Sequence, residues 1–224
     1  MSLAIFDLDY TLIATDSDHG WGEFMVEQGL VDADVYKAEN DRFYADYERG
    51  ELDIQAYNEF SLEPLTRFSM DQLASLHTQF SREKIAPAML PKAKALLEKH
   101  RARGDFILII TSTNRFITQP IAESLGVDAL LATEAEIVDN RYTGRMIGTP
   151  CFQEGKITRL ATWLKEDASA QGFRGDDSDA YFYSDSINDL PLLKQAKHPV
   201  AVDPDDALRA AAESNGWPIM SLRD

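Results

Sequence analysis

Short apolar runs alternate with segments of helical pattern from residue 104 to the C-terminus. Strands are predicted where these runs occur, at 105–111, 128–133, 180–186, 198–203 and 217–220. The first of them, DFILIIT, is almost continuously apolar, which is typical of a strand buried on both faces. Helices are predicted between the runs, at 115–125, 154–167, 187–196 and 204–216. Strands that alternate with helices predict an α/β domain with a parallel sheet covered by helices on both faces.

The early part of the chain departs from this alternation. A short apolar strand is predicted at 3–7, and residues 15–82 then carry apolar side chains at three- and four-residue steps without a convincing strand. A helix at 89–104, closed by a glycine, leads into the alternating part. We therefore predict a core formed by residues 1–14 and 86–224, interrupted by an all-helical insert at 15–85.

A polar-edged segment at 135–148 has the pattern of a hairpin. Its centre is Asp139-Asn140, a pair of residues that favours the tight turns joining two antiparallel strands. We therefore predict a hairpin at 135–148.

Charge and cysteine content limit the possible partners. The chain has 22 Lys and Arg against 38 Asp and Glu, a formal charge of −16, which argues against nucleic acid and anionic membranes as partners. No run approaches the roughly 20 apolar residues of a membrane span, and residues 1–6 do not read as a signal peptide. The single cysteine, Cys151, excludes an intramolecular disulfide and is typical of a reducing compartment. The expected setting is the cytoplasm and the expected partner a small molecule.

Polar side chains gather where the predicted strands end. They are Asp7 and Asp9 after the first strand, Thr111 and Ser112 after the second, Lys156 at a helix start, and Asp185, Asn188 and Asp189 after the strand at 180–186. Ligands of open α/β sheets bind at these carboxyl ends. Each segment alone also fits a turn or a helix cap, but their joint occurrence in this order predicts a single site.

Phosphoryl transfer is the chemistry that suits these groups. Asp7 and Asp185 can supply the carboxylates that Mg²⁺ binds, and a carboxylate can also attack phosphorus to form an aspartyl-phosphate. Lys156 and Thr111 can bind phosphoryl oxygens. Asp9 can protonate the leaving oxygen and then activate water. A cation would also relieve the repulsion between the two neighbouring carboxylates.

The motifs resemble those of the haloacid dehalogenase superfamily over nearly the whole chain. The matching residues are Asp7-Leu8-Asp9-Tyr10-Thr11 for the first motif, Thr111 for the second, Lys156 for the third, and Asp185 and Asp189 for the fourth. The resemblance implies a Rossmann-like core, dependence on Mg²⁺ and an aspartyl-phosphate intermediate. The helical insert is similar to the small cap of phosphoserine phosphatase-like members, and a cap of this kind closes over the site.

The resemblance also implies roles for individual residues. Asp7 would be nucleophile and metal ligand, and Asp9 would be the acid/base, binding the metal through its backbone carbonyl. Asp185 would be the third metal ligand from the protein, supported by Asp189. The dehalogenases lack the second acid of the first motif, so Asp9 favours a phosphatase.

The leaving group is expected to be recognised by the insert. Asp16 lies where phosphoserine phosphatases hold the substrate amine, with Asp18 and His19 close by. An ungapped alignment puts Glu59 where those enzymes have an arginine for the substrate carboxylate, and the nearest arginine is Arg67. A glutamate repels a carboxylate and attracts an amine. The expected substrate is therefore a phosphate ester with a cationic or neutral leaving group, and histidinol phosphate fits.

Other functions remain open from the sequence. They are a phosphoserine phosphatase, a phosphatase of broad specificity, and a transferase that passes the phosphoryl group to an alcohol. A non-catalytic binding module is disfavoured because Asp7, Asp9, Lys156 and Asp185 are all present.

Overall fold

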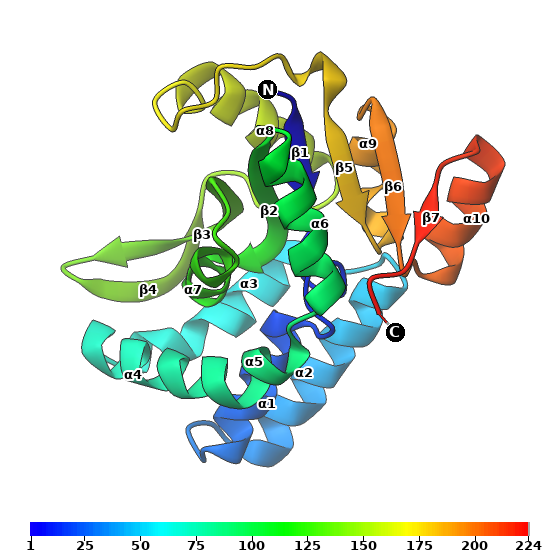
Figure 1. Ribbon diagram of the computed structural model, residues 1–224. Helices are drawn as coiled ribbons and strands as arrows, with labels where there is room; N and C mark the ends of the chain where they lie inside the picture. The colour runs from blue at the N-terminus through cyan, green and yellow to red at the C-terminus, as the bar shows by residue number, and fades with distance from the viewer. Residues whose placement is uncertain (224) are drawn as a thin grey trace.

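A seven-stranded sheet forms the centre of the computed structural model, which describes residues 1–223 (Figure 1). The strand order is β4-β3-β2-β1-β5-β6-β7, and every neighbouring pair is parallel except β3 and β4. The strands are β1 (Leu3–Phe6), β2 (Phe106–Asn114), β3 (Ala129–Val138), β4 (Arg141–Ile147), β5 (Tyr181–Ser184), β6 (His198–Val202) and β7 (Ile219–Met220). The parallel sheet predicted from the alternation is confirmed.

Helices cover both faces of this sheet. They are α6 (Pro91–Ala102), α7 (Arg115–Leu125), α8 (Glu154–Glu166), α9 (Leu190–Leu193) and α10 (Asp206–Asn215). β1 shows why two layers are needed, because all four of its residues are buried and they point alternately to opposite faces. Ala4 and Phe6 join the apolar cluster under α6 and α7, whereas Leu3 and Ile5 join the cluster under α8, α9 and α10.

The hairpin is present at the edge of the sheet. β3 continues directly into it, and Asp139 and Asn140 turn the chain with φ values of 49° and 58°. Elsewhere the boundaries differ from expectation. β1 ends at Phe6, β2 runs on to Asn114, and the helix predicted at 187–196 is a 3₁₀ turn followed by the short α9.

The insert between β1 and α6 is entirely helical. It contains α1 (Ser17–Glu27), α2 (Ala33–Glu48), α3 (Ile54–Leu62), a 3₁₀ turn (Glu63–Arg67), α4 (Met70–Phe80), a π-helical turn (Ser81–Ile85) and α5 (Ala86–Ala88). The two segments that connect the insert to the core lie side by side. Ile13 forms an isolated antiparallel bridge with Met89, and the Ala14 amide donates to the Ala88 carbonyl at 2.8 Å. In Figure 1 the insert lies below the carboxyl ends of the central strands.

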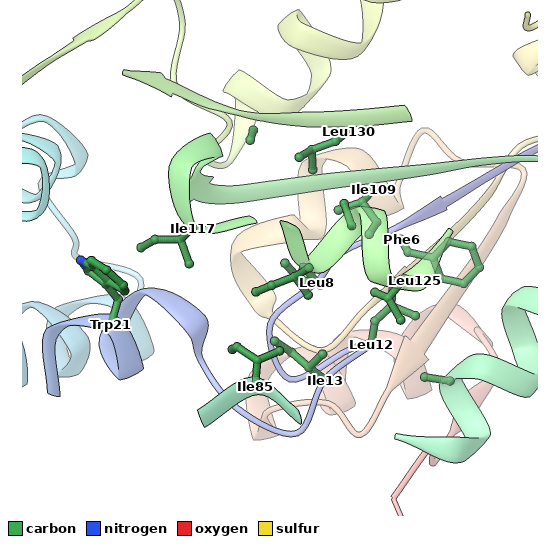
Figure 2. Close-up of a cluster of buried hydrophobic side chains, with 14 of the residues drawn as sticks. Phe6, Leu8, Leu12, Ile13, Trp21, Ile85, Ile109, Ile117, Leu125 and Leu130 are labelled. Carbon is green, nitrogen blue, oxygen red and sulfur yellow. The ribbon is translucent and has the colours of Figure 1, made fainter. Parts of the chain in front are cut away.

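One apolar cluster joins the insert to the core. Trp21 and Ile85 of the insert belong to the same buried cluster as Leu8 and Ile117 of the core (Figure 2). The Trp21 ring meets Phe116 of α7 edge-to-face at a centroid separation of 5.1 Å. The insert is therefore docked on the core through side chains of both regions.

No helix within the described residues is long and apolar enough to span a membrane. Cys151 is a free thiol buried in the core, and burial raises its pKa to about 11. It is therefore a packing residue, as its apolar surroundings require.

Candidate active site

The turn after β1 presents Asp7 and Asp9. The Leu8 carbonyl accepts hydrogen bonds from the amides of residues 11, 12 and 13, so the chain coils tightly instead of continuing as a strand. Leu8 and Leu12 anchor this turn because both are fully buried. Tyr10 has a φ of 53°, which reverses the chain at the tip of the turn. The two carboxylates therefore come together through this turn rather than through strand alternation.

Asp7 belongs to a buried charge network with Lys156 and Asp189. The Lys156 Nζ lies 2.8 Å from Asp7 Oδ1 and 2.7 Å from the Asp189 carboxylate. Asp189 also accepts a hydrogen bond from the Ser184 hydroxyl at 2.7 Å. Burial, together with the charges of Asp189 and Asp9, raises the pKa of Asp7 to about 7 even though Lys156 opposes this shift.

Lys156 is placed by the start of α8. Its side chain is 3% exposed, and although burial favours the neutral amine, Asp189 and Asp7 raise its pKa above the ordinary value. Gly155 makes the position possible, since a Cβ there would lie 2.0 Å from the Pro150 carbonyl oxygen. Lys156 thus enters the site as a rigidly held cation.

Asp9 is held by two donors. Its Oδ1 accepts from the Ser17 amide at 2.7 Å, and its Oδ2 accepts from the Thr113 hydroxyl at 2.9 Å. Burial and the charge of Asp16 raise the pKa of Asp9 to about 7. A carboxyl group with a pKa near neutrality is suited to proton transfer. The sequence reasoning missed Ser17 and Thr113, although Thr113 stands only two positions after Thr111.

Thr111 and Ser112 lie beside Asp9 at the end of β2. Their backbone runs through an irregularity in the pairing with β3 between Ile110 and Asn114. The Thr111 hydroxyl accepts from the Thr113 amide at 3.2 Å, and Ser112 lines the cavity at the site. This irregular strand end brings hydroxyl and amide donors to the same edge as Asp7.

Asp185 completes the carboxylate group. Its Oδ1 accepts a hydrogen bond of 2.9 Å from the Thr11 hydroxyl, which links the fourth motif to the first. Burial and the charge of Asp7 raise the pKa of Asp185 well above its ordinary value. Asp7, Asp185 and Asp189 therefore repel one another around the single ammonium of Lys156.

This excess of negative charge fits a divalent cation. Within the described residues no three His, Cys, Asp or Glu side chains form a ready-made metal cage. Mg²⁺ needs less, because it takes one or two carboxylates and completes its octahedron with water and substrate oxygens. The carboxylates of Asp7 and Asp185, with the Asp9 carbonyl, would supply these ligands, while Asp189 is engaged by Lys156 and Ser184.

A small cavity of about 40 Å³ lies between this edge and the cap helices. Its lining residues from the core and its linker are Asp7, Asp9, Tyr10, Asp16, Ser112 and Thr113, and those from the cap are Asp18, His19, Asn40, Phe43, Tyr44, Tyr47, Leu52, Ile54 and Tyr57. Four aromatic rings of the cap thus face the carboxylates of the core. The sequence reasoning missed these rings because their pattern is also that of ordinary helix packing.

Asp16 and His19 both line this cavity, as expected, but both have structural partners. Asp16 caps α1 by accepting from the amides of Asp18 and His19 at 2.9 Å each. The His19 ring is held by Asn40, whose Nδ2 lies 3.1 Å from His19 Nδ1. Asn40 fits there because Gly22 has no side chain, since a Cβ would lie 2.6 Å from Asn40 Nδ2.

Two expected substrate contacts fall outside the cavity lining. Glu59 is exposed on α3, whose inner side carries Asn58, Ser61 and Leu62, so the structure does not bring it to the site. In this structure Glu59 therefore lies in solvent, and the contact expected from the ungapped alignment is not formed.

Asn188 is buried, but it bridges the two regions instead of facing the cavity. Its Nδ2 donates to the Tyr47 carbonyl at 3.1 Å, and its Oδ1 accepts from Gln153 Nε2 at 3.1 Å. A second bridge beside it joins the hydroxyls of Tyr10 and Tyr44, 3.0 Å apart. The cap is thus held against the core on this side of the site.

Comparisons with known proteins agree with this geometry. Residues 4–194 match the haloacid dehalogenase-like hydrolase family. A histidinol-phosphatase from Neisseria meningitidis serogroup C (strain 8013) is 47% identical over 223 residues, which cover 99% of each chain. The crystal structure of a protein with unknown function from Bordetella pertussis Tohama I superposes with a TM-score of 0.90 at 41% identity, covering 99% of each chain.

A more distant structure shows the same fold. A substrate-bound phosphoserine phosphatase superposes with a TM-score of 0.68 at 16% identity, covering 99% of this chain and 92% of that chain. The predicted Rossmann-like core with its helical insert is confirmed by these matches. The enzyme class predicted from the strand-end residues, a phosphatase of this superfamily, is confirmed as well. By its sequence over most of its length, the chain belongs to the haloacid dehalogenase-like hydrolase family.

Proposed function

We propose that this phosphatase hydrolyses histidinol phosphate with Mg²⁺ through an aspartyl-phosphate on Asp7. The observation that carries the proposal is the cavity wall. Among the described residues that line it, none is an arginine or lysine, whereas Asp16, Asp18 and four aromatic rings are present. A substrate carboxylate would meet repulsion there, and an amine with an aromatic ring would find complementary groups. The 47% identical relative from Neisseria meningitidis is named a histidinol-phosphatase, which supports the same substrate.

The first step is attack by Asp7. Lys156 binds Oδ1 at 2.8 Å, which leaves Oδ2 to form a bond to phosphorus while the bond from phosphorus to the alcohol oxygen breaks. Asp9 gives its proton to that oxygen, so histidinol leaves as an alcohol rather than as an alkoxide. In this proposal Thr111, Ser112 and Lys156 bind the phosphoryl oxygens as charge develops, which is supported by their position at the same edge as Asp7.

The second step releases phosphate. Asp9, now ionised, takes a proton from a water molecule, whose oxygen attacks the phosphorus of the aspartyl-phosphate. The bond from phosphorus to Asp7 breaks, which restores the Asp7 carboxylate and yields inorganic phosphate. Ser17 and Thr113 keep Asp9 in the same orientation in both steps. Mg²⁺, when bound, supplies positive charge that offsets the charge of the phosphoryl oxygens.

Residues 15–85 act as the cap in this proposal, and residues 1–14 and 86–224 as the catalytic core. The Tyr10–Tyr44 contact and the Asn188–Tyr47 contact hold the cap over the cavity, which excludes bulk water from the phosphorylated enzyme. The substrate is a small metabolite, and the strongly acidic chain suits neither nucleic acid nor an anionic membrane. The lone reduced Cys151 supports a cytoplasmic setting.

Phosphate release tests the proposal. With Mg²⁺ present, kcat/KM for L-histidinol phosphate should exceed that for L-phosphoserine by about 100-fold or more, and EDTA should abolish both activities. A preference for phosphoserine would contradict the cavity assignment, and weak turnover of both would show that another phosphate ester is the substrate. Added alcohols should not become phosphorylated, and a phosphorylated acceptor would identify a transferase.

A further inference from the structure

Asp18 is a buried carboxylate of the cavity that the catalytic steps do not use. It stands in the first turn of α1, is 8% exposed and lines the cavity. Its Oδ1 has no hydrogen-bond partner and is closed off from solvent. Buried carboxylate oxygens are normally paired, because an unpaired one loses its hydration without compensation. Asp18 Oδ1 is therefore an unpaired hydrogen-bond acceptor in the wall of the cavity.

The groups around Asp18 provide no hydrogen-bond donor for Oδ1 and no positive charge. The phenol groups of Tyr57 and Tyr36 are close enough to interact electrostatically with its carboxylate, and neither carries a positive charge. The charges that act on it are those of Asp16 and Asp9, both negative. Within residues 1–223 no lysine, arginine or histidine forms an ion pair with it. Burial and Asp16 raise the pKa of Asp18 well above its ordinary value, as expected for an acid without a positive partner.

Asp18 belongs to cap helix α1, whereas Asp7 and Asp9 follow β1 of the core. Asp9 accepts from the Ser17 amide at 2.7 Å, and Asp16 accepts from the Asp18 amide at 2.9 Å. The chain thus leads from Asp7 and Asp9 after β1, through Asp16 at the N-cap of α1, to Asp18 in its first turn, and all four line the cavity. A leaving group that extends from phosphorus into the cap meets Asp16 first and Asp18 last.

We propose that Asp18, supported by Tyr57, is a specificity-determining residue that accepts a hydrogen bond from a ring N–H at the far end of the leaving group. The inference rests on the proposed function and deepens it. In histidinol phosphate the ammonium is borne by the carbon next to the phosphorylated CH₂ group, and the imidazole lies one carbon further away. Asp16 then faces the ammonium, and Asp18 receives the imidazole N–H beside the rings of Phe43 and Tyr57.

A pair of substrates separates the two contacts. 2-Aminopropyl phosphate keeps the ammonium of histidinol phosphate but has a methyl group in place of the imidazolylmethyl group. In Asp18→Asn the ratio of kcat/KM for histidinol phosphate over 2-aminopropyl phosphate should fall about 10- to 100-fold, mainly through KM. Asp16→Asn should lower kcat/KM for both substrates. Glu59→Gln is the matched control, an exposed cap carboxylate whose removal should leave the ratio unchanged. A ratio in Asp18→Asn within about twofold of wild type would overturn the inference.

Thermal unfolding distinguishes recognition from structural support. A recognition residue leaves an unpaired buried carboxylate in the free protein, so Asp18→Asn should unfold at a Tm no lower than wild type. A lower Tm with both substrates equally affected would identify a structural residue and overturn the inference. Should Asp18→Asn not fold, Tyr57→Phe provides the second test. It removes the supporting hydroxyl and should lower the same ratio about 3- to 10-fold, and an unchanged ratio would contradict the proposal.

A third readout separates this inference from the proposed function. If wild type does not hydrolyse histidinol phosphate, the proposed function fails, and p-nitrophenyl phosphate becomes the reporter substrate. Histidinol should then inhibit its hydrolysis more strongly than 2-aminopropanol, and Asp18→Asn should remove that difference. Equal inhibition of wild type by the two amines would overturn the Asp18 assignment itself.

Discussion

The core edge and the cap side of the cavity differ in whether their buried carboxylate oxygens have hydrogen-bond partners. In the core, Asp7, Asp9 and Asp189 all have hydrogen-bond partners within the chain. On the cap side of the cavity, Asp18 Oδ1 is buried without one. This difference fits a site whose reacting groups are positioned before substrate arrives and whose proposed recognition surface is completed by the substrate.

Loss of the nucleophile should produce the largest effect on the core side of this comparison. Asp7→Asn keeps the shape of the side chain but cannot form the phospho-enzyme, so kcat should fall by about 10⁴-fold or more. The fold should persist, since burial already raises the pKa of Asp7 to about 7 and a neutral group costs little there. Phosphate release and thermal unfolding measure both effects. Substantial activity in a folded Asp7→Asn protein would refute the nucleophile assignment.

Removal of the core cation should cost both rate and stability. Lys156→Met leaves Asp7 and Asp189 facing each other without positive charge, so kcat should fall about 10²- to 10³-fold. The free energy of unfolding should fall by about 3–5 kcal/mol in urea titrations, because a broken buried pair leaves unpaired charge. The control is Lys165→Met, an exposed lysine on the same helix. If both variants behave alike, the network does not hold the site.

A smaller effect is expected from the group that orients Asp9. Thr113→Val removes the hydroxyl at 2.9 Å from Asp9 Oδ2 and leaves the Ser17 amide in place. Because one of two hydrogen bonds survives, kcat should fall only about tenfold. Steady-state kinetics with Thr158→Val, an exposed threonine of α8, as control checks this. A loss as large as that of Asp7→Asn would show that Thr113 does more than position Asp9.

Acid should weaken both regions through one buried histidine in each. Burial lowers the pKa of His77 in α4 and of His100 in α6 below the ordinary value of 6.5. Above pH 6.5 both rings are neutral whether folded or unfolded. As the pH falls below 6.5, the histidines of the unfolded chain bind protons before those of the folded protein. For each ring, the free energy of unfolding then falls by about 1.4 kcal/mol per pH unit until the folded ring also binds a proton.

The difference in unfolding free energy between pH 7.5 and pH 5.5, measured in urea, isolates these groups. Relative to wild type, His77→Gln and His100→Gln should each shift this difference toward higher stability at pH 5.5, because the other titrating groups, including the buried carboxylates with raised pKa values, cancel in the comparison. An unchanged loss in both variants would show that neither ring resists protonation.

The smallest effect concerns the expected contact that the structure places outside the cavity. Glu59→Arg should change phosphoserine turnover by less than about twofold, because an exposed charge on α3 is screened by solvent and salt. Kinetics with phosphoserine and histidinol phosphate check this. A clear gain with phosphoserine would mean that α3 turns this position toward the substrate in solution.

Much of the core could be predicted from the sequence because its signals are local. A buried strand is followed directly by Asp7-Leu8-Asp9, which places both carboxylates within one turn, and Lys156 lies at the start of a recognisable helix. The carboxyl ends of parallel strands necessarily share one edge, so the order of the motifs was enough to bring these groups together. The family match agrees with this prediction.

The cap could be predicted as helical but not as a binding surface. Helical periodicity does not say which side of α3 faces the cavity. Tyr57 lines the cavity, whereas Glu59, two positions further along the helix, is exposed to solvent. The roles of Thr113 and Ser17 could not be predicted, because each depends on a hydrogen bond to Asp9, a residue distant in the sequence from Thr113 and outside the helix of Ser17.

The sequence by itself determined the sheet, the helical insert and the reacting residues, because apolar periodicity and strand ends act over a few residues. Only the tertiary structure decided which side chains surround the leaving group. That choice depends on how α1 packs against α2 and β2 and how α3 packs against β4, an arrangement that buries Asp18 Oδ1 without a partner and leaves Glu59 in solvent. Packing between segments distant in the chain leaves no local signal in the sequence.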